Sequence, residues 1–92
     1  MQDRINWTAG ETVNLLDAPS NTPLRIVDIA GGESVRRRLM ALGFHKDDVV
    51  ALDGRAIFRG PLLVRNCTSD TTVALGLGIA QKVLVEPVHE PS

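Results

Sequence analysis

The sequence predicts a small, mainly β fold: a barrel of five or six short strands with one helix at about residues 34–42. Short β-type runs alternate with turn residues from position 24 to position 87, and only one stretch has the spacing of an amphipathic helix. A chain of 92 residues forms one domain, and so small a sheet hides its edges most easily by closing into a barrel.

The strands follow from runs of aliphatic residues that end at glycine, proline or small polar residues. Asp53-Gly54 is a hairpin dipeptide, and Gly60-Pro61 interrupts the pattern, so Gly60 and Pro61 are assigned structural roles. The predicted strands are 24–29, 49–52, 56–58, 62–66, 71–75 and 81–87.

The ends of the chain do not continue this pattern. We assign residues 1–14 to an N-terminal extension of uncertain order, 15–87 to the barrel domain and 88–92 to a C-terminal tail. The segment "VNLLDAP" (13–19) is interpreted as a short stretch that docks on the barrel.

The predicted helix lies in "SVRRRLMALGF". Val35, Leu39 and Leu42 recur at helical spacing and are expected on one buried face. Gly43 stands where a left-handed residue commonly ends a helix, and Phe44 follows where an apolar contact back onto the last turn is typical. Gly43 is therefore a structural residue in this interpretation.

The three arginines of the helix have two interpretations. Arg36 and Arg37 face outward, and Arg38 flanks the apolar stripe, as expected for the solvated side of an amphipathic helix. The alternative is a specific contact with a partner protein or a phosphate, for which Arg36 and Arg37 are the candidates. The formal net charge of −1 and the three aromatic residues do not favour nucleic-acid binding.

Catalytic and cofactor motifs are not evident in the sequence. The segment Gly76-Leu77-Gly78 does not match a phosphate-binding loop and is interpreted as a permissive turn, with Leu77 and Ile79 as a candidate apolar contact for a partner. Cys67 is a single cysteine and is expected to be a buried or half-buried structural thiol. We therefore expect no enzyme activity and no cofactor.

The best candidate for a metal site is the turn that contains His45, Asp47 and Asp48. Imidazole and carboxylate ligands suit divalent transition metal ions, and Cys67 could join them from a neighbouring strand. Acidic residues in such a turn are more often simply solvated. We expect weak metal binding at most.

Three ordered segments carry a resemblance to a known family. They are "RIVDIAGGESVRRRLMALGF", "FRGPLLVRN" and "VALGLGIAQKVLVEP", and together they resemble the FeoA family over about residues 15–87. The chain departs from the family pattern at Asp47 and Asp48, where a glycine is usual. It departs again at Gly76-Leu77-Gly78, where a charged residue is common.

This resemblance implies an SH3-like β-barrel that acts as a cytosolic accessory to a FeoB-type iron permease, a membrane protein with a cytosolic G-protein domain. It also extends to the C-terminal module of DtxR-type metal-dependent repressors, so a metal-responsive regulatory module is the alternative. A nucleic-acid-binding barrel is the third and least favoured class. No apolar run reaches the ~18–20 residues of a membrane span, so we expect a cytoplasmic protein without membrane insertion.

Overall fold

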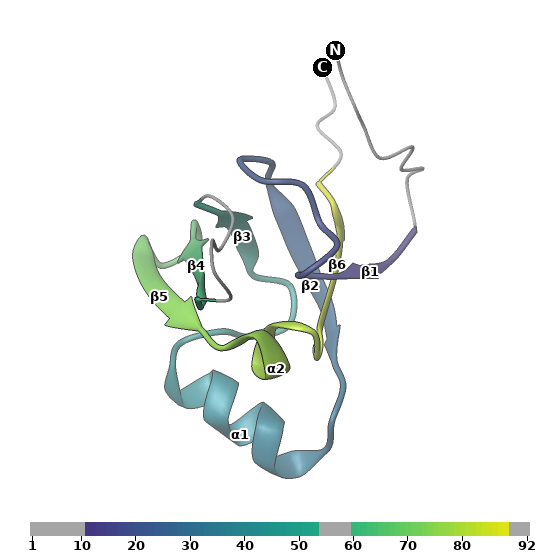
Figure 1. The fold of residues 1–92 in the computed structure, drawn as a ribbon, viewed down its shortest axis with the longest axis vertical. Coiled ribbons are helices and arrows are strands. Elements are labelled where there is room, and N and C mark those ends of the chain that lie inside the picture. Colours follow the sequence, from purple (N-terminus) through teal and green to yellow (C-terminus); the bar gives the residue numbers. More distant parts are fainter. Residues whose placement is uncertain (1–10, 54–59, 89–92) are drawn as a thin grey trace.

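The computed structural model describes residues 11–53 and 60–88, which form six strands and two helices (Figure 1). In chain order these are β1 (Val13–Asn14), β2 (Leu24–Ile29), α1 (Glu33–Ala41), β3 (Val49–Leu52), β4 (Leu62–Asn66), β5 (Thr71–Leu75), α2 (Leu77–Ala80) and β6 (Val83–Pro87). The bounds of β2, β3, β4 and β5 are those predicted from the sequence, and β6 begins two residues later than predicted. The predicted strand 56–58 lies outside the described residues.

All six strands belong to one antiparallel sheet in the order β1-β6-β2-β3-β4-β5. The register shifts between Ile26 and Asp28 where β2 pairs with β6, and such an irregularity bends a strand. The sheet curls so that β4 and β5 lie to one side of β2 and β6, with β3 joining the two parts and α1 below (Figure 1). The predicted mainly β, SH3-like barrel is confirmed, with β1 and β5 as the two ends of its sheet.

The core is mainly aliphatic and lies inside the curled sheet. Alternate residues of β4 point inward, because side chains of a strand alternate between its two faces. In β2 the alternation of Leu24 and Ile26 is interrupted by the register shift, and Ile29 is the next buried residue. Leu39 of α1 and Phe44 just after it are buried against this core. The sheet and the end of α1 therefore form one packed unit.

Helix α1 ends in the motif that the sequence predicts. Gly43 has a φ of 95°, and its N–H donates to the carbonyl of Met40. The N–H of Phe44 donates to the carbonyl of Leu39 at 2.9 Å, which completes a Schellman motif. Leu39 and Phe44 are also the buried apolar pair that accompanies this motif.

Two predicted burials are wrong. Leu42 was expected on the buried stripe but is 41% exposed, because the helix ends at Ala41 and the chain turns at Gly43 to bury Phe44 instead. Cys67 was expected to be buried or half-buried but is exposed, because β4 ends at Asn66 and Cys67 belongs to the following turn.

Two elements differ from the sequence interpretation. The strand β1 was not predicted; it pairs with β6 and places Leu15 and Ala18 of the following turn in the core. The segment after Gly76 is the one-turn helix α2, where a turn was expected.

Candidate docking surface at the end of helix α1

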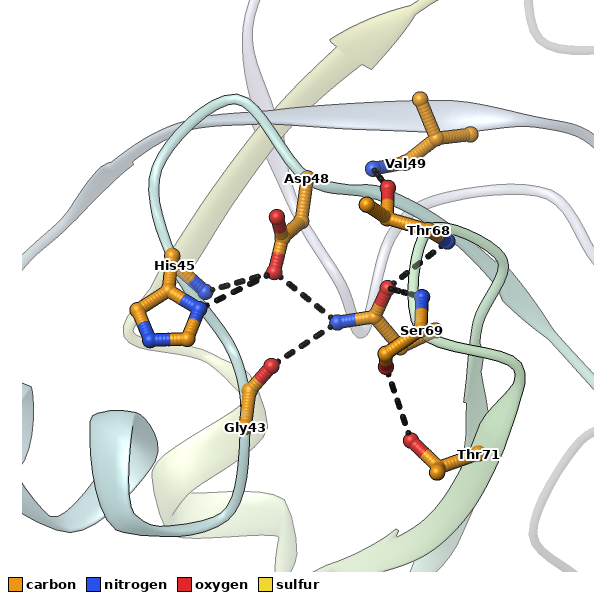
Figure 2. A network of polar contacts seen from close by, with 8 residues as sticks. Gly43, His45, Asp48, Val49, Thr68, Ser69 and Thr71 are labelled. Carbon is orange, nitrogen blue, oxygen red and sulfur yellow. Dashed lines mark hydrogen bonds and ion pairs between the residues drawn. The ribbon is translucent and has the colours of Figure 1, made fainter.

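The loop after α1 is joined to the turn between β4 and β5 through the side chain of Asn66. Asn66 is 1% exposed, and among residues 11–53 and 60–88 it is the one polar residue that is buried. Its Nδ2 donates to the carbonyl of Gly43 at 3.0 Å and to Oδ2 of Asp48 at 2.9 Å. Its Oδ1 accepts from the backbone N–H groups of Thr68 and Ser69 (Figure 2). Four hydrogen bonds therefore satisfy one buried amide and fix two loops together.

The carboxylate of Asp48 is the charged member of this network. Its Oδ2 also accepts from the backbone N–H of His45 at 2.9 Å, and the Nδ1 of His45 lies 3.4 Å away. Burial raises the pKa of Asp48, but the hydrogen bonds from Asn66 and from the backbone and ring of His45 outweigh it. The pKa of Asp48 therefore lies below its ordinary value, and Asp48 is a structural acceptor.

Two hollows lie beside the end of α1, and Met40 and His45 line both. One, of about 280 Å³, is lined by Asp28, Ile29, Arg36, Met40, His45 and Lys46. The other, of about 550 Å³, lies between the end of α1 and β5, with Met40, Ala41 and Leu42 on the helix side and Thr71 and Val73 on the strand side. Met40 is 56% exposed, so an apolar side chain stands between them.

The three predicted metal ligands are only partly brought together. His45 and Asp48 are neighbours, as described above. Asp47 lies in the same turn with a φ of 76° and is exposed. The pKa of Arg25 is raised mainly by the hydrogen bond and the charge of Glu86, and the charge of Asp47 adds a smaller effect. Within residues 11–53 and 60–88, no group of three or more His, Cys, Asp and Glu side chains could hold a metal ion.

The predicted arginine contacts lie on the exposed side of α1. The Arg36 guanidinium is 3.7 Å from the carboxylate of Asp28, and that of Arg37 is 3.5 Å from Glu33 one turn earlier. Both arginine side chains are more than half exposed. They are thus accessible, and each has a solvated acidic neighbour.

The second predicted contact lies on α2. Leu77 and Ile79 are half-buried and pack against the core, so only part of each side chain is open to a partner. Of the residues assigned structural roles, Gly43 has the predicted left-handed backbone, whereas Gly60 and Pro61 lead into β4.

Sequence reasoning missed Asn66, Met40 and Leu42 as site residues. Asn66 occupies the third inward position of the strand 62–66, after Leu62 and Val64, and that alternation could have marked it as a buried polar residue. The exposure of Met40 and Leu42 depends on where the helix ends against the sheet.

Comparison with known proteins assigns the chain to a family. The model of the FeoA domain family matches residues 13–87, from the start of β1 to the end of β6. The chain belongs to the FeoA family. No curated protein matches this FeoA-family chain.

Solved structures share the fold at low identity. A crystal structure of an iron uptake regulatory protein (FeoA) is 22% identical with a TM-score of 0.74, and the match covers 85% of this chain and 100% of that one. The NMR structure of a FeoA-like protein from Clostridium acetobutylicum is 21% identical with a TM-score of 0.74, covering 92% and 94%. A manganese-dependent transcriptional repressor is 21% identical with a TM-score of 0.75, and the match covers 88% of this chain but 44% of the repressor.

In the part of the FeoA-family chain that the structure describes, neither helix is long and apolar enough to cross a membrane.

Proposed function

We propose that this FeoA-family chain is a non-enzymatic cytosolic accessory protein of ferrous iron uptake, and that it docks on the cytosolic part of a FeoB-type iron permease. The observation that carries this proposal is the family match, which spans every strand and helix from residue 13 to residue 87. The name of one solved neighbour, iron uptake regulatory protein (FeoA), supports the same role. The permease as partner follows from the family resemblance of the sequence.

The exposed arginines of α1 are the first candidate for the permease contact. Ion pairs between solvated side chains contribute only about 0–1 kcal/mol, so Arg36 and Arg37 can exchange Asp28 and Glu33 for acidic groups of a partner at little cost. Such a contact steers association and weakens as salt screens it. Arg38 adds a third exposed cation to the same helix.

The exposed parts of Leu77 and Ile79 are the competing candidate. They offer less apolar area than fully exposed side chains because both residues also pack on the core. A charged residue at position 77 therefore disturbs the core as well as the surface, and its effect on folding must be measured alongside its effect on binding.

Affinity capture of the permease from solubilised membranes of the same cell tests the proposal. We expect the wild-type chain to retain the permease, and Arg36→Glu with Arg37→Glu to retain several-fold less at low ionic strength. The matched control is Arg65→Glu, which reverses an exposed charge on β4. Leu77→Asp, compared at a temperature where it remains folded, reports on the second surface.

Failure of the wild-type chain to retain the permease at any ionic strength would contradict docking. Normal capture by the double arginine variant, with loss only in Leu77→Asp, would move the contact to α2. Arg36 and Arg37 would then have no part in the contact and would belong only to the solvated side of α1.

A second candidate function is a metal-responsive regulatory module, because the chain shares its fold with part of a manganese-dependent transcriptional repressor. Titration with cobalt or ferrous ions tests it through the amide signals of His45, Asp47 and Asp48. A saturable response that His45→Ala abolishes would support this function. Millimolar ion without a localised response would exclude it at this turn.

A further inference from the structure

We infer that the smaller of the two hollows, beside Arg36, binds a segment of a partner protein in which an acidic side chain stands next to an aliphatic one. This hollow has a volume of about 280 Å³, near the small end of ligand pockets, so it holds a few side chains. Arg36 also belongs to the proposed permease contact, so the identity of the partner rests on that proposed function. The chemistry of the bound segment follows from the hollow itself.

The lining of this hollow comes from three segments that hydrogen bonds hold together. The end of β2, the helix α1 and the loop after α1 contribute Asp28, Ile29, Arg36, Met40, His45 and Lys46. In the loop, the N–H of His45 donates to Oδ2 of Asp48 at 2.9 Å. The N–H of Asp47 donates to the carbonyl of Ile26 in β2 at 2.7 Å. Lys46 lies between these two anchored residues, so the main chain that carries it is fixed beside β2.

The charged side chains of the lining favour an anionic group. Arg36 and Lys46 are positive, and Asp28 is the single carboxylate among the lining residues. His45 adds no negative charge in either protonation state. The side chain of Lys46 has no ion pair with residues 11–53 or 60–88. The hollow is therefore net positive on a chain whose formal net charge is −1, and charge complementarity selects an acidic partner.

The contact between Arg36 and Asp28 leaves Arg36 open to a second carboxylate. The Arg36 guanidinium lies 3.7 Å from Oδ1 of Asp28, which is longer than an ordinary hydrogen bond, and both side chains are more than half exposed. The same Oδ1 atom accepts a hydrogen bond from the N–H of Ile29 at 2.8 Å. Because a guanidinium has five N–H donors in a planar fork, Arg36 can bind a partner's carboxylate while Asp28 stays in place.

The apolar part of the lining calls for an aliphatic side chain beside the acid. Met40 is 56% exposed, and Ile29 joins it in the lining. Met40 follows Arg36 by four residues on α1, so the two side chains lie on the same face of the helix. An aliphatic side chain next to the bound carboxylate would cover Met40 and remove apolar surface from water. An inorganic anion or a lipid headgroup has no such side chain to place there.

Titration of the full chain with a capped peptide of alternating glutamate and leucine tests the inference. We expect saturable shifts in the amide signals of Asp28, Arg36, Met40 and Lys46. Two control peptides separate the two requirements. Glutamine in place of glutamate removes the charge, and serine in place of leucine removes the apolar contact. Each control peptide should bind several-fold more weakly than the parent peptide.

Substitutions in the chain locate the site, at physiological ionic strength where more distant charges are screened. Arg36→Met should weaken binding of the parent peptide about two- to fivefold, the range for an exposed ion pair. Arg37→Met is the matched control, because Arg37 is the next residue on α1 but does not line the hollow, so binding should be unchanged. Asp28→Asn should tighten binding, because it removes the one negative charge of the lining and keeps an Oδ1 acceptor for Ile29.

Several results would overturn the inference. Equal loss of binding in Arg36→Met and Arg37→Met would mean that the whole face of α1 attracts anions. Binding to phosphatidylserine vesicles without binding to the peptide would assign the arginines to a membrane surface. Equal binding of the glutamine peptide, or no saturable shift at millimolar peptide, would exclude an acidic segment. Concentration-dependent shifts of the lining residues without peptide would assign the hollow to a second copy of the chain.

The permease is absent from these titrations, so the two proposals can fail separately. Capture of the permease by the wild-type chain without peptide binding would overturn the acidic segment alone. Saturable peptide binding that follows the expected order of variants, without capture of the permease, would support the acidic segment and contradict the permease as its carrier.

Discussion

At the scale of single residues, Gly43 decides where α1 stops and where Phe44 is buried. Its φ of 95° is a conformation that residues with a Cβ rarely adopt, although a Cβ built there would meet no atom within 4 Å. The requirement for glycine is therefore one of backbone conformation and not of space.

Gly43→Val should lower the free energy of unfolding by about 1–2 kcal/mol, because a β-branched residue resists the left-handed conformation. Gly76→Val is the matched control: Gly76 also has open space around a Cβ, but its φ is −63°. Chemical denaturation measures both. An equal effect of the two substitutions would show that the cap conformation of Gly43 is not what matters.

The carboxylate of Asp48 makes the stability of the fold depend on pH. Its pKa is lower in the folded chain than its ordinary value of 3.8, so its ionised form stabilises the fold above that pH. This contribution is lost as the pH falls below about 4 and through the lower folded pKa.

The difference in unfolding free energy between the wild type and Asp48→Asn should therefore shrink as the pH is lowered from 6 to 3. Urea denaturation at each pH measures it. A difference that stays constant over this range would mean that the hydrogen bonds from Asn66 and His45 do not favour the ionised form.

At the scale of elements, Asn66 holds the loop after α1 against the turn between β4 and β5. Four hydrogen bonds converge on a side chain at the end of a strand. Without them the carbonyl of Gly43 and the N–H groups of Thr68 and Ser69 lose their partner in a part-buried place. The network therefore shapes the polar end of the hollow beside β5.

Asn66→Ala should cost about 1–3 kcal/mol, because it leaves several part-buried polar groups without their partner. Thr72→Ala, on the exposed side of β5, should change stability by no more than about 0.5 kcal/mol. Thermal or chemical unfolding distinguishes them. Similar small effects of both would show that water replaces the Asn66 contacts without loss.

At the scale of the whole molecule, local patterns predict most of the barrel. The bounds of β2, β3, β4 and β5 could be read directly, because each is a run of aliphatic residues between turn residues. The strand β1 could not, because it has two residues and its partner β6 lies about seventy positions later. The four-residue helix α2 was obscured by Gly78 within it and Gly76 just before it, because glycine favours a turn.

The candidate site was less predictable than the fold. The arginines of α1 are visible as an exposed face from helical spacing alone. The hollow beside β5 is not, because it forms where the end of α1 meets a strand about thirty residues later in the chain. The mistaken burial of Leu42 has the same origin, since helical spacing does not show that the chain turns at Gly43.

Ferrous iron uptake by cells that lack this chain is the most direct test of its proposed role. With the permease present in the membrane, we expect the initial rate of uptake at limiting ferrous iron to fall several-fold. The wild-type chain should restore it, and the chain with Arg36→Glu and Arg37→Glu should restore it only in part. An unchanged rate of uptake without the chain, at the same amount of permease, would contradict a role in iron uptake.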